Sequence, residues 1–81
     1  MENSNIFRKL QELNGKDILL LWEGNEVNGV LYDVKAINTK FPEHTRRYEL
    51  TVESGRVLLT FDHLDIKSVS TDEQNIIVLL P

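Results

Sequence analysis

Hydrophobic residues change their spacing at a glycine near the start of the chain, and this change separates one helix from a series of strands. Before Gly15, apolar residues recur at helical spacing, with polar residues on the opposite side. These apolar positions are Ile6, Phe7, Leu10 and Leu13. Ser4 is a suitable N-cap, and Asn14-Gly15 is typical of a helix end. We therefore predict a helix over about residues 4–14.

After Lys16, apolar residues fall in short runs between turn-forming residues, which is typical of β-strands. Residues 18–22 are continuously apolar and predict a buried strand. Residues 47–53 alternate between apolar and polar, and Ser54-Gly55 joins them to residues 56–61, which are mostly apolar. A short connection containing glycine favours an antiparallel hairpin between these two runs.

The remaining segments predict further strands and the bends that a small barrel needs. Gly29 lies inside the predicted strand 27–37 and indicates a bulge, a bend or a close approach of two backbones. Residues 38–45 contain a proline and predict the longest exposed loop. Residues 62–65 predict a 3₁₀ turn that places Leu64 over the barrel end. A strand over 66–70 and a polar turn follow, and the aliphatic run 75–80 forms either a sixth strand or an interface.

The chain has 81 residues and no cysteine, so one domain must be stabilised by packing alone. We predict a single, mostly β domain over residues 1–81. Its expected architecture is an N-terminal α-helix followed by a five- or six-stranded antiparallel SH3-like barrel. The barrel is expected over about residues 16–70, with a C-terminal strand over about 75–80.

Charge and hydropathy limit the expected partners. The net charge of -4 argues against nucleic-acid binding as the default function, because such proteins usually carry an excess of basic residues. No apolar stretch approaches the roughly 20 residues that span a bilayer. The first four residues are polar and acidic, unlike a signal peptide. We therefore expect a cytoplasmic protein that does not bind membranes.

The sequence contains no recognisable catalytic or metal-binding pattern. His44 and His63 are its only histidines, and neither has partners at the spacing of a metal site or a catalytic triad. Phosphate-binding glycine motifs and a nucleophilic serine motif are also missing. We expect no enzymatic activity, no metal and no cofactor.

Basic residues surround the predicted long loop, although the whole chain is acidic. They are Lys35, Lys40, His44, Arg46 and Arg47. This group could bind phosphate or an acidic partner, or it could be an ordinary solvated loop. Phe41 could stack on a base there or fold back onto the barrel. Trp22 and Tyr32 could form an aromatic binding surface, but core packing is favoured for both.

The order of elements resembles the Sm-like superfamily of small β-barrels over about residues 5–70. The segments that carry this resemblance are residues 13–16 and 21–31. Within them, Gly24, Gly29 and Leu31 match the spacing of the first Sm motif. Val34 matches the apolar position that comes next in that motif. Residues 57–69 are similar to the second half of the same barrel and to the C-terminal SH3-like domain of the bacterial ribosome maturation factor.

The resemblance implies an RNA site near the ends of the second and fourth strands. Lys35 and Asn38 stand where the family has an Asp and an Asn. Residues 61–64 stand where the family has its second RNA-binding motif. Of these residues, the resemblance assigns only Phe61 and His63 to the site. Asp62 is left out because a phosphate contact at its position favours a cation.

Two functions from different classes remain open. The first is an interaction module that binds a protein partner, or another copy of itself, through a strand edge or the C-terminal apolar run. The second is an Sm-like RNA-binding protein that forms a ring. The candidate ligand-binding residues are Lys35, Lys40, Phe41, Arg46, Arg47, Phe61 and His63. The sequence leaves the ligand and the oligomeric state open.

Overall fold

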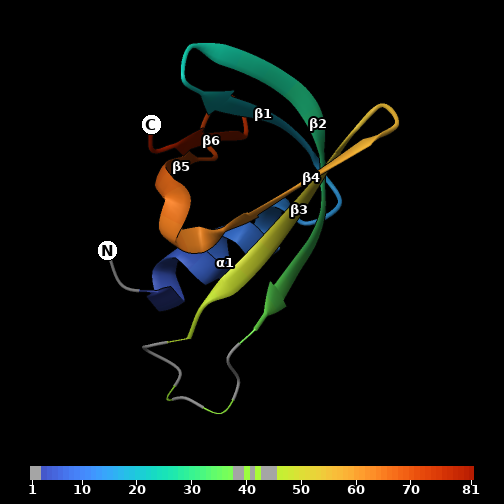
Figure 1. Ribbon diagram of the computed structural model, residues 1–81. Coiled ribbons are helices and arrows are strands. Elements are labelled where there is room, and N and C mark those ends of the chain that lie inside the picture. The colour runs from blue at the N-terminus through green and yellow to red at the C-terminus, as the bar shows by residue number, and fades with distance from the viewer. Residues whose placement is uncertain (1–2, 38–39, 41, 43–45) are drawn as a thin grey trace.

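The computed structural model describes residues 3–37, 40, 42 and 46–81, and most of these residues lie in strands. The elements are α1 (Asn3–Leu13), β1 (Asp17–Trp22), β2 (Asn25–Ala36), β3 (Tyr48–Ser54), β4 (Val57–Asp62), η2 (His63–Asp65), β5 (Ile66–Ser70) and β6 (Ile76–Leu79) (Figure 1). The predicted helix and strands are confirmed, with boundaries that differ by one or two residues. α1 begins at Asn3, one residue before Ser4.

All six strands belong to one sheet in the order β4-β3-β2-β1-β6-β5. The aliphatic run near the C-terminus is a strand, β6, which pairs with β1 on one side and with β5 on the other. The prediction of a wholly antiparallel barrel is wrong in one pair, because β6 runs parallel to β1. After β5 the chain reverses direction in residues 71–75, so β6 runs antiparallel to β5. β6 lies between β5 and β1 in the sheet and is parallel to β1.

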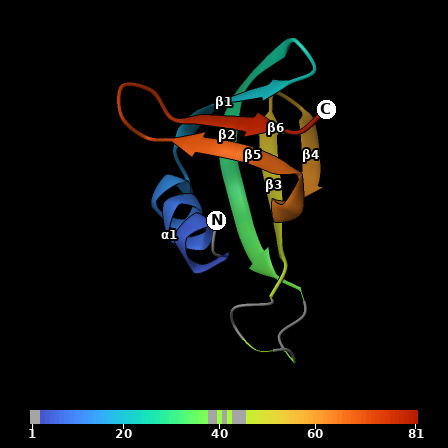
Figure 2. The same cartoon turned by 90° about the vertical axis from the view of Figure 1, so that its left-hand side faces the viewer.

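The described strands do not close into a complete barrel through hydrogen-bonded pairing. The two ends of the sheet are β4 and β5, and no ladder between described residues joins them. Figure 2 shows β4 at one side of the molecule, next to the ends of β5 and β6. The sheet is therefore strongly curved but has two free edges.

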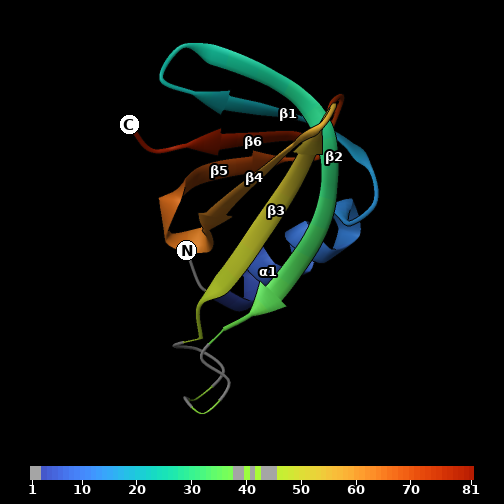
Figure 3. The ribbon, with the colours of Figure 1, turned by 45° about the vertical axis from the view of Figure 1, so that its right-hand side comes forward.

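One hydrophobic core lies between the curved sheet and α1. Helix positions Ile6, Leu10 and Leu13 are buried in it, as the helical spacing predicts. The inward-facing strand residues that complete this core are Ile18, Leu20, Leu31, Leu50, Val52, Ile66, Val69 and Ile77. Figure 3 shows β2 extending from its hairpin with β1 to the level of α1, so one long strand spans the core.

Glycines determine two features of the sheet. At Gly24 the backbone has φ of 80°, and the preceding Glu23 has φ of 48°, so these two residues form a tight turn between β1 and β2. At Gly29 a Cβ atom would lie 2.6 Å from the carbonyl oxygen of Glu53, which confirms the predicted close backbone approach. The bulge in β2 lies elsewhere, at Tyr32, where the register with β3 shifts.

Three sequence-based expectations about burial are wrong. Trp22 is 49% exposed and Tyr32 is 62% exposed, so neither belongs to the core. β1 alternates between buried and more exposed positions, because only one of its faces is turned to α1 and the core. Leu64 is 57% exposed in the 3₁₀ turn, and His63 is the buried residue there instead.

Candidate functional site

Of the basic residues predicted to surround the long loop, Lys35, Lys40, Arg46 and Arg47 belong to the described part of the chain. Lys35 and Lys40 are exposed, and Arg46 is half-buried. Arg47 is exposed and forms an ion pair with Asp62. Phe41 and His44 lie outside the described residues. Asp62 is thus paired with a basic side chain.

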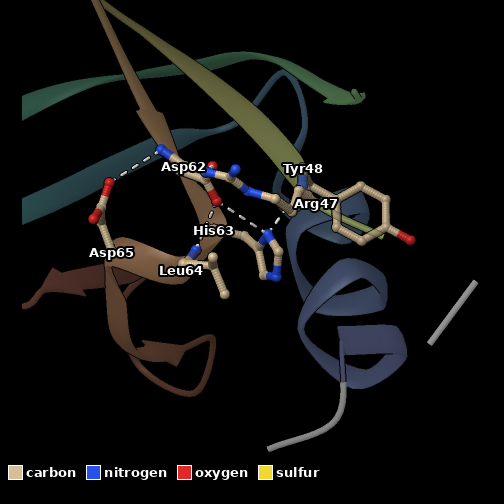
Figure 4. Close-up of polar contacts among 6 residues, drawn as sticks. All are labelled: Arg47, Tyr48, Asp62, His63, Leu64 and Asp65. Carbon is tan, nitrogen blue, oxygen red and sulfur yellow. Dashed lines mark hydrogen bonds and ion pairs between the residues drawn. The ribbon is translucent and has the colours of Figure 1, made fainter. Parts of the chain in front are cut away.

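The turn η2 is held by a small polar network around Asp62 and His63 (Figure 4). One carboxylate oxygen of Asp62 accepts a hydrogen bond from the Leu64 N–H at 3.0 Å. The Asp62 N–H donates to Oδ2 of Asp65 at 3.3 Å, which completes a capping box. These bonds stabilise the sharp change of direction between β4 and β5.

His63 is only 2% exposed, and it has a structural contact on one side of its ring. Its Nδ1 atom accepts a hydrogen bond from the Tyr48 N–H at 2.9 Å and lies 3.3 Å from Oδ1 of Asp62. Nε2 is buried and has no hydrogen-bond partner among the described residues. The Tyr48 ring meets the imidazole edge to face, and Phe7 of α1 stacks on the other side of Tyr48. His63 therefore belongs to the packing between α1 and the sheet.

Phe61 and His63, the two residues that the family resemblance assigns to one site, lie on different surfaces. Phe61 faces a large groove beside β4. His63 borders a separate cavity of about 240 Å³ between Ile6 of α1 and β5. The structure does not bring these two side chains together on one face.

A groove of about 820 Å³, larger than the cavity beside His63, borders β4, and we call it the β4 groove. It lies between β4, the turn that joins β1 to β2, and the last residues of the described chain after β6. Its apolar wall consists of Leu20, Trp22, Val27, Leu59, Phe61 and Leu79. Such a volume and such a lining are typical of ligand sites in proteins.

Acidic residues surround the β4 groove. Glu23 lines it from the turn between β1 and β2, Glu26 lines it from the start of β2, and Asp65 lines it from η2. No lysine, arginine or histidine is present among the described residues that line it. The groove therefore combines an apolar wall with negative charge.

One wall of the groove is also a free sheet edge. The connection between β3 and β4 contains two residues, so Ser54 and Val57 form the hydrogen-bonded pair that closes the hairpin. Because bonded and non-bonded pairs alternate along an antiparallel ladder, the N–H groups of Leu58 and Thr60 point away from β3. Asp62 follows the same alternation, since its N–H donates to Asp65. The backbone of β4 thus offers donors and acceptors along its outer side.

Sequence reasoning missed most of the groove, although one signal for it existed. Trp22 is an aromatic residue at the end of a strand, directly before a turn, and it was considered for an aromatic binding surface before core packing was favoured. Only Phe61, among the predicted site residues, lines the groove.

Comparisons with known proteins do not add a family. No protein-family model, no curated protein and no solved structure matches this chain. Among the described residues, no group of three or more His, Asp or Glu side chains is placed to hold a metal ion. The longest described helix, α1, has 11 residues and is too short to cross a membrane.

Proposed function

We propose that this chain is a cytoplasmic binding domain rather than an enzyme, and that it captures an extended segment of a partner protein along β4. The observation that carries this proposal is the free edge of β4, which borders a large apolar groove. A partner strand gains main-chain hydrogen bonds at such an edge, and pockets beside the edge select its side chains.

The composition of β4 supports binding. Leu58 is 58% exposed, Val57 is also exposed, and the strand contains neither lysine nor proline. Soluble proteins usually block a free edge with those residues or cover it. Of the two surfaces expected from the sequence, the strand edge is favoured over the C-terminal run, because β6 already pairs on both sides.

A second candidate is the Sm-like assembly, in which copies pair edge to edge into a ring that binds RNA. The observation that favours it is the presence of two free edges, β4 and β5, at opposite ends of one sheet. The helix, the curved sheet and the 3₁₀ turn before β5 also support an SH3-like barrel that is incompletely closed. The acidic groove and the Arg47–Asp62 ion pair favour the protein-binding alternative.

Proline substitution at the edge tests the first function. Thr60→Pro removes an outward N–H group without removing a bond to β3, and Thr60→Val is the matched control that keeps this donor. We expect the wild-type domain to enrich peptides from a phage-displayed library of random sequences of about ten residues. Those peptides should bind Thr60→Val normally and Thr60→Pro about tenfold more weakly. Equal binding to both variants would contradict strand capture at β4.

The ring alternative is tested by light scattering during size-exclusion chromatography, at two protein concentrations. A closed ring with a constant mass would favour Sm-like assembly over capture of a foreign strand. If that ring binds RNA through basic residues, affinity should fall steeply with salt. The double substitution Arg46→Ala and Arg47→Ala should then reduce the salt dependence.

A further inference from the structure

The β4 groove and the β4 edge form one continuous surface. Leu59, Thr60 and Phe61 belong to the edge strand and also line the groove. A strand paired with β4 would lie about 4.8 Å away from it, on the side where the sheet is open. Side chains of such a strand point alternately to its two faces, so every second one would enter the groove.

The groove favours apolar side chains from the segment that enters it. Leu59 and Phe61 are half-buried and share the inner face of β4. Across the groove from them, Val27 and Leu79 are also half-buried and pack against the core. Covering this surface would remove apolar area from water, which favours binding. The side chains of the partner segment that contact Leu59 and Phe61 should therefore be apolar.

The charges of the groove favour basic residues in the same segment. Glu23 and Glu26 come from the β1–β2 hairpin, in its turn and at the start of β2, and Asp65 comes from η2. No basic side chain among the described lining residues offsets these charges. Trp22 is half exposed in the same groove, and an indole ring attracts a guanidinium group through its face. Nucleic acid, which is a polyanion, would be repelled by this surface.

We propose that the β4 groove binds an extended segment of a partner protein whose groove-facing side chains include both apolar residues and lysine or arginine. This proposal rests on the proposed function, strand capture at β4, and adds the chemistry of the partner. Both kinds of side chain lie on the face of the segment that is turned to the groove, where the apolar ones contact its wall and the basic ones contact Glu23, Glu26 and Asp65.

Three labelled hexapeptides test the proposal by fluorescence anisotropy with the full chain. Every second residue is serine in all three, so that the other positions share one face of the strand. These positions alternate leucine with arginine in the first peptide, leucine with glutamate in the second, and serine with arginine in the third. We expect the leucine–arginine peptide to bind most tightly, because only it satisfies both the apolar wall and the acidic rim. Trp22 is the only tryptophan, so quenching of its emission would locate the bound peptide at the groove.

Matched charge variants separate a specific effect from general attraction. Glu23→Gln combined with Glu26→Gln removes two negative charges from the groove. Glu12→Gln combined with Glu73→Gln removes two from exposed positions that do not line it. We expect the first pair to weaken binding of the leucine–arginine peptide about three- to tenfold and the second pair to have little effect.

The outcomes distinguish this proposal from the proposed function. If Thr60→Pro weakens binding but the leucine–glutamate peptide binds as well as the leucine–arginine peptide, strand capture stands and the basic partner is wrong. An equal effect of the two glutamine pairs would also contradict a basic partner. If the groove pair alone weakens binding and Thr60→Pro does not, the charge preference stands without strand pairing. Binding of no peptide, or displacement of the peptide by single-stranded polyuridine, overturns the proposal.

Discussion

The two free edges of the sheet differ in how well they are protected against another strand. β5 has five residues, its ladder with β6 is interrupted at Lys67, and α1 packs against it. β4 contains neither lysine nor proline, and it exposes Val57 and Leu58. Short strands, lysine, bulges and helical cover are known means of blocking an edge. The comparison indicates that this fold closes one edge to pairing and leaves the other available.

The largest effect is expected where β2 and β3 approach each other, because this contact positions the hairpin that carries β4. Gly29→Val should lower the free energy of unfolding by about 3 kcal/mol or more, since its Cβ would collide with the backbone of Glu53. Urea unfolding measures the change. Asn28→Val, at the exposed neighbouring position, is the control and should change stability little. Wild-type stability of Gly29→Val would refute the close approach.

Two proline substitutions in β4 sharpen the assignment of its inner and outer sides. Leu59→Pro should lower the free energy of unfolding by about 2–4 kcal/mol, because it removes a hydrogen bond to β3. Thr60→Pro should cost about 1 kcal/mol or less, since its N–H points outward. The same urea titrations compare them. Similar losses of unfolding free energy for the two variants would mean that the N–H of Thr60 already donates a hydrogen bond within the domain.

The turn that joins the two edges is expected to depend on the buried histidine. His63→Leu leaves the Tyr48 N–H without its acceptor and should lower the free energy of unfolding by about 1–3 kcal/mol. Leu64→Ala, at the exposed position next to it, should cost about 0.5 kcal/mol or less. Thermal unfolding of both variants tests the difference. A larger loss for Leu64→Ala would show that Leu64, and not His63, packs in this turn.

The smallest effect on stability is expected from removing a lysine from the β5 edge and from adding one to the β4 edge. Lys67→Thr on β5 and Leu58→Lys on β4 should each change the free energy of unfolding by about 0.5 kcal/mol or less, because both side chains are exposed. Their effect should appear in self-association instead. Sedimentation velocity should show increased association for Lys67→Thr and reduced association for Leu58→Lys. Reduced association for Lys67→Thr and increased association for Leu58→Lys would contradict the conclusion that β5 is the protected edge and β4 the available one.

Local patterns predicted most of the elements but few of the contacts between distant segments. The helical spacing of Ile6, Leu10 and Leu13 identified α1, and the alternation of Tyr48, Leu50 and Val52 identified the buried face of β3. Both signals lie within a few consecutive residues. Of the candidate site residues, only Phe61 borders the groove, because a groove formed by distant segments leaves no periodic signal in any one of them.

The sequence by itself determined where the helix, strands and turns lie, because spacing, glycine and capping residues act over short distances. It left open whether residues 75–80 form a strand, and it did not predict that His63 would be buried while Trp22 and Leu64 are exposed. Only the tertiary structure decided these features. The reason is that burial depends on which strands become neighbours, and the insertion of β6 between β1 and β5 arranges the edges and the β4 groove.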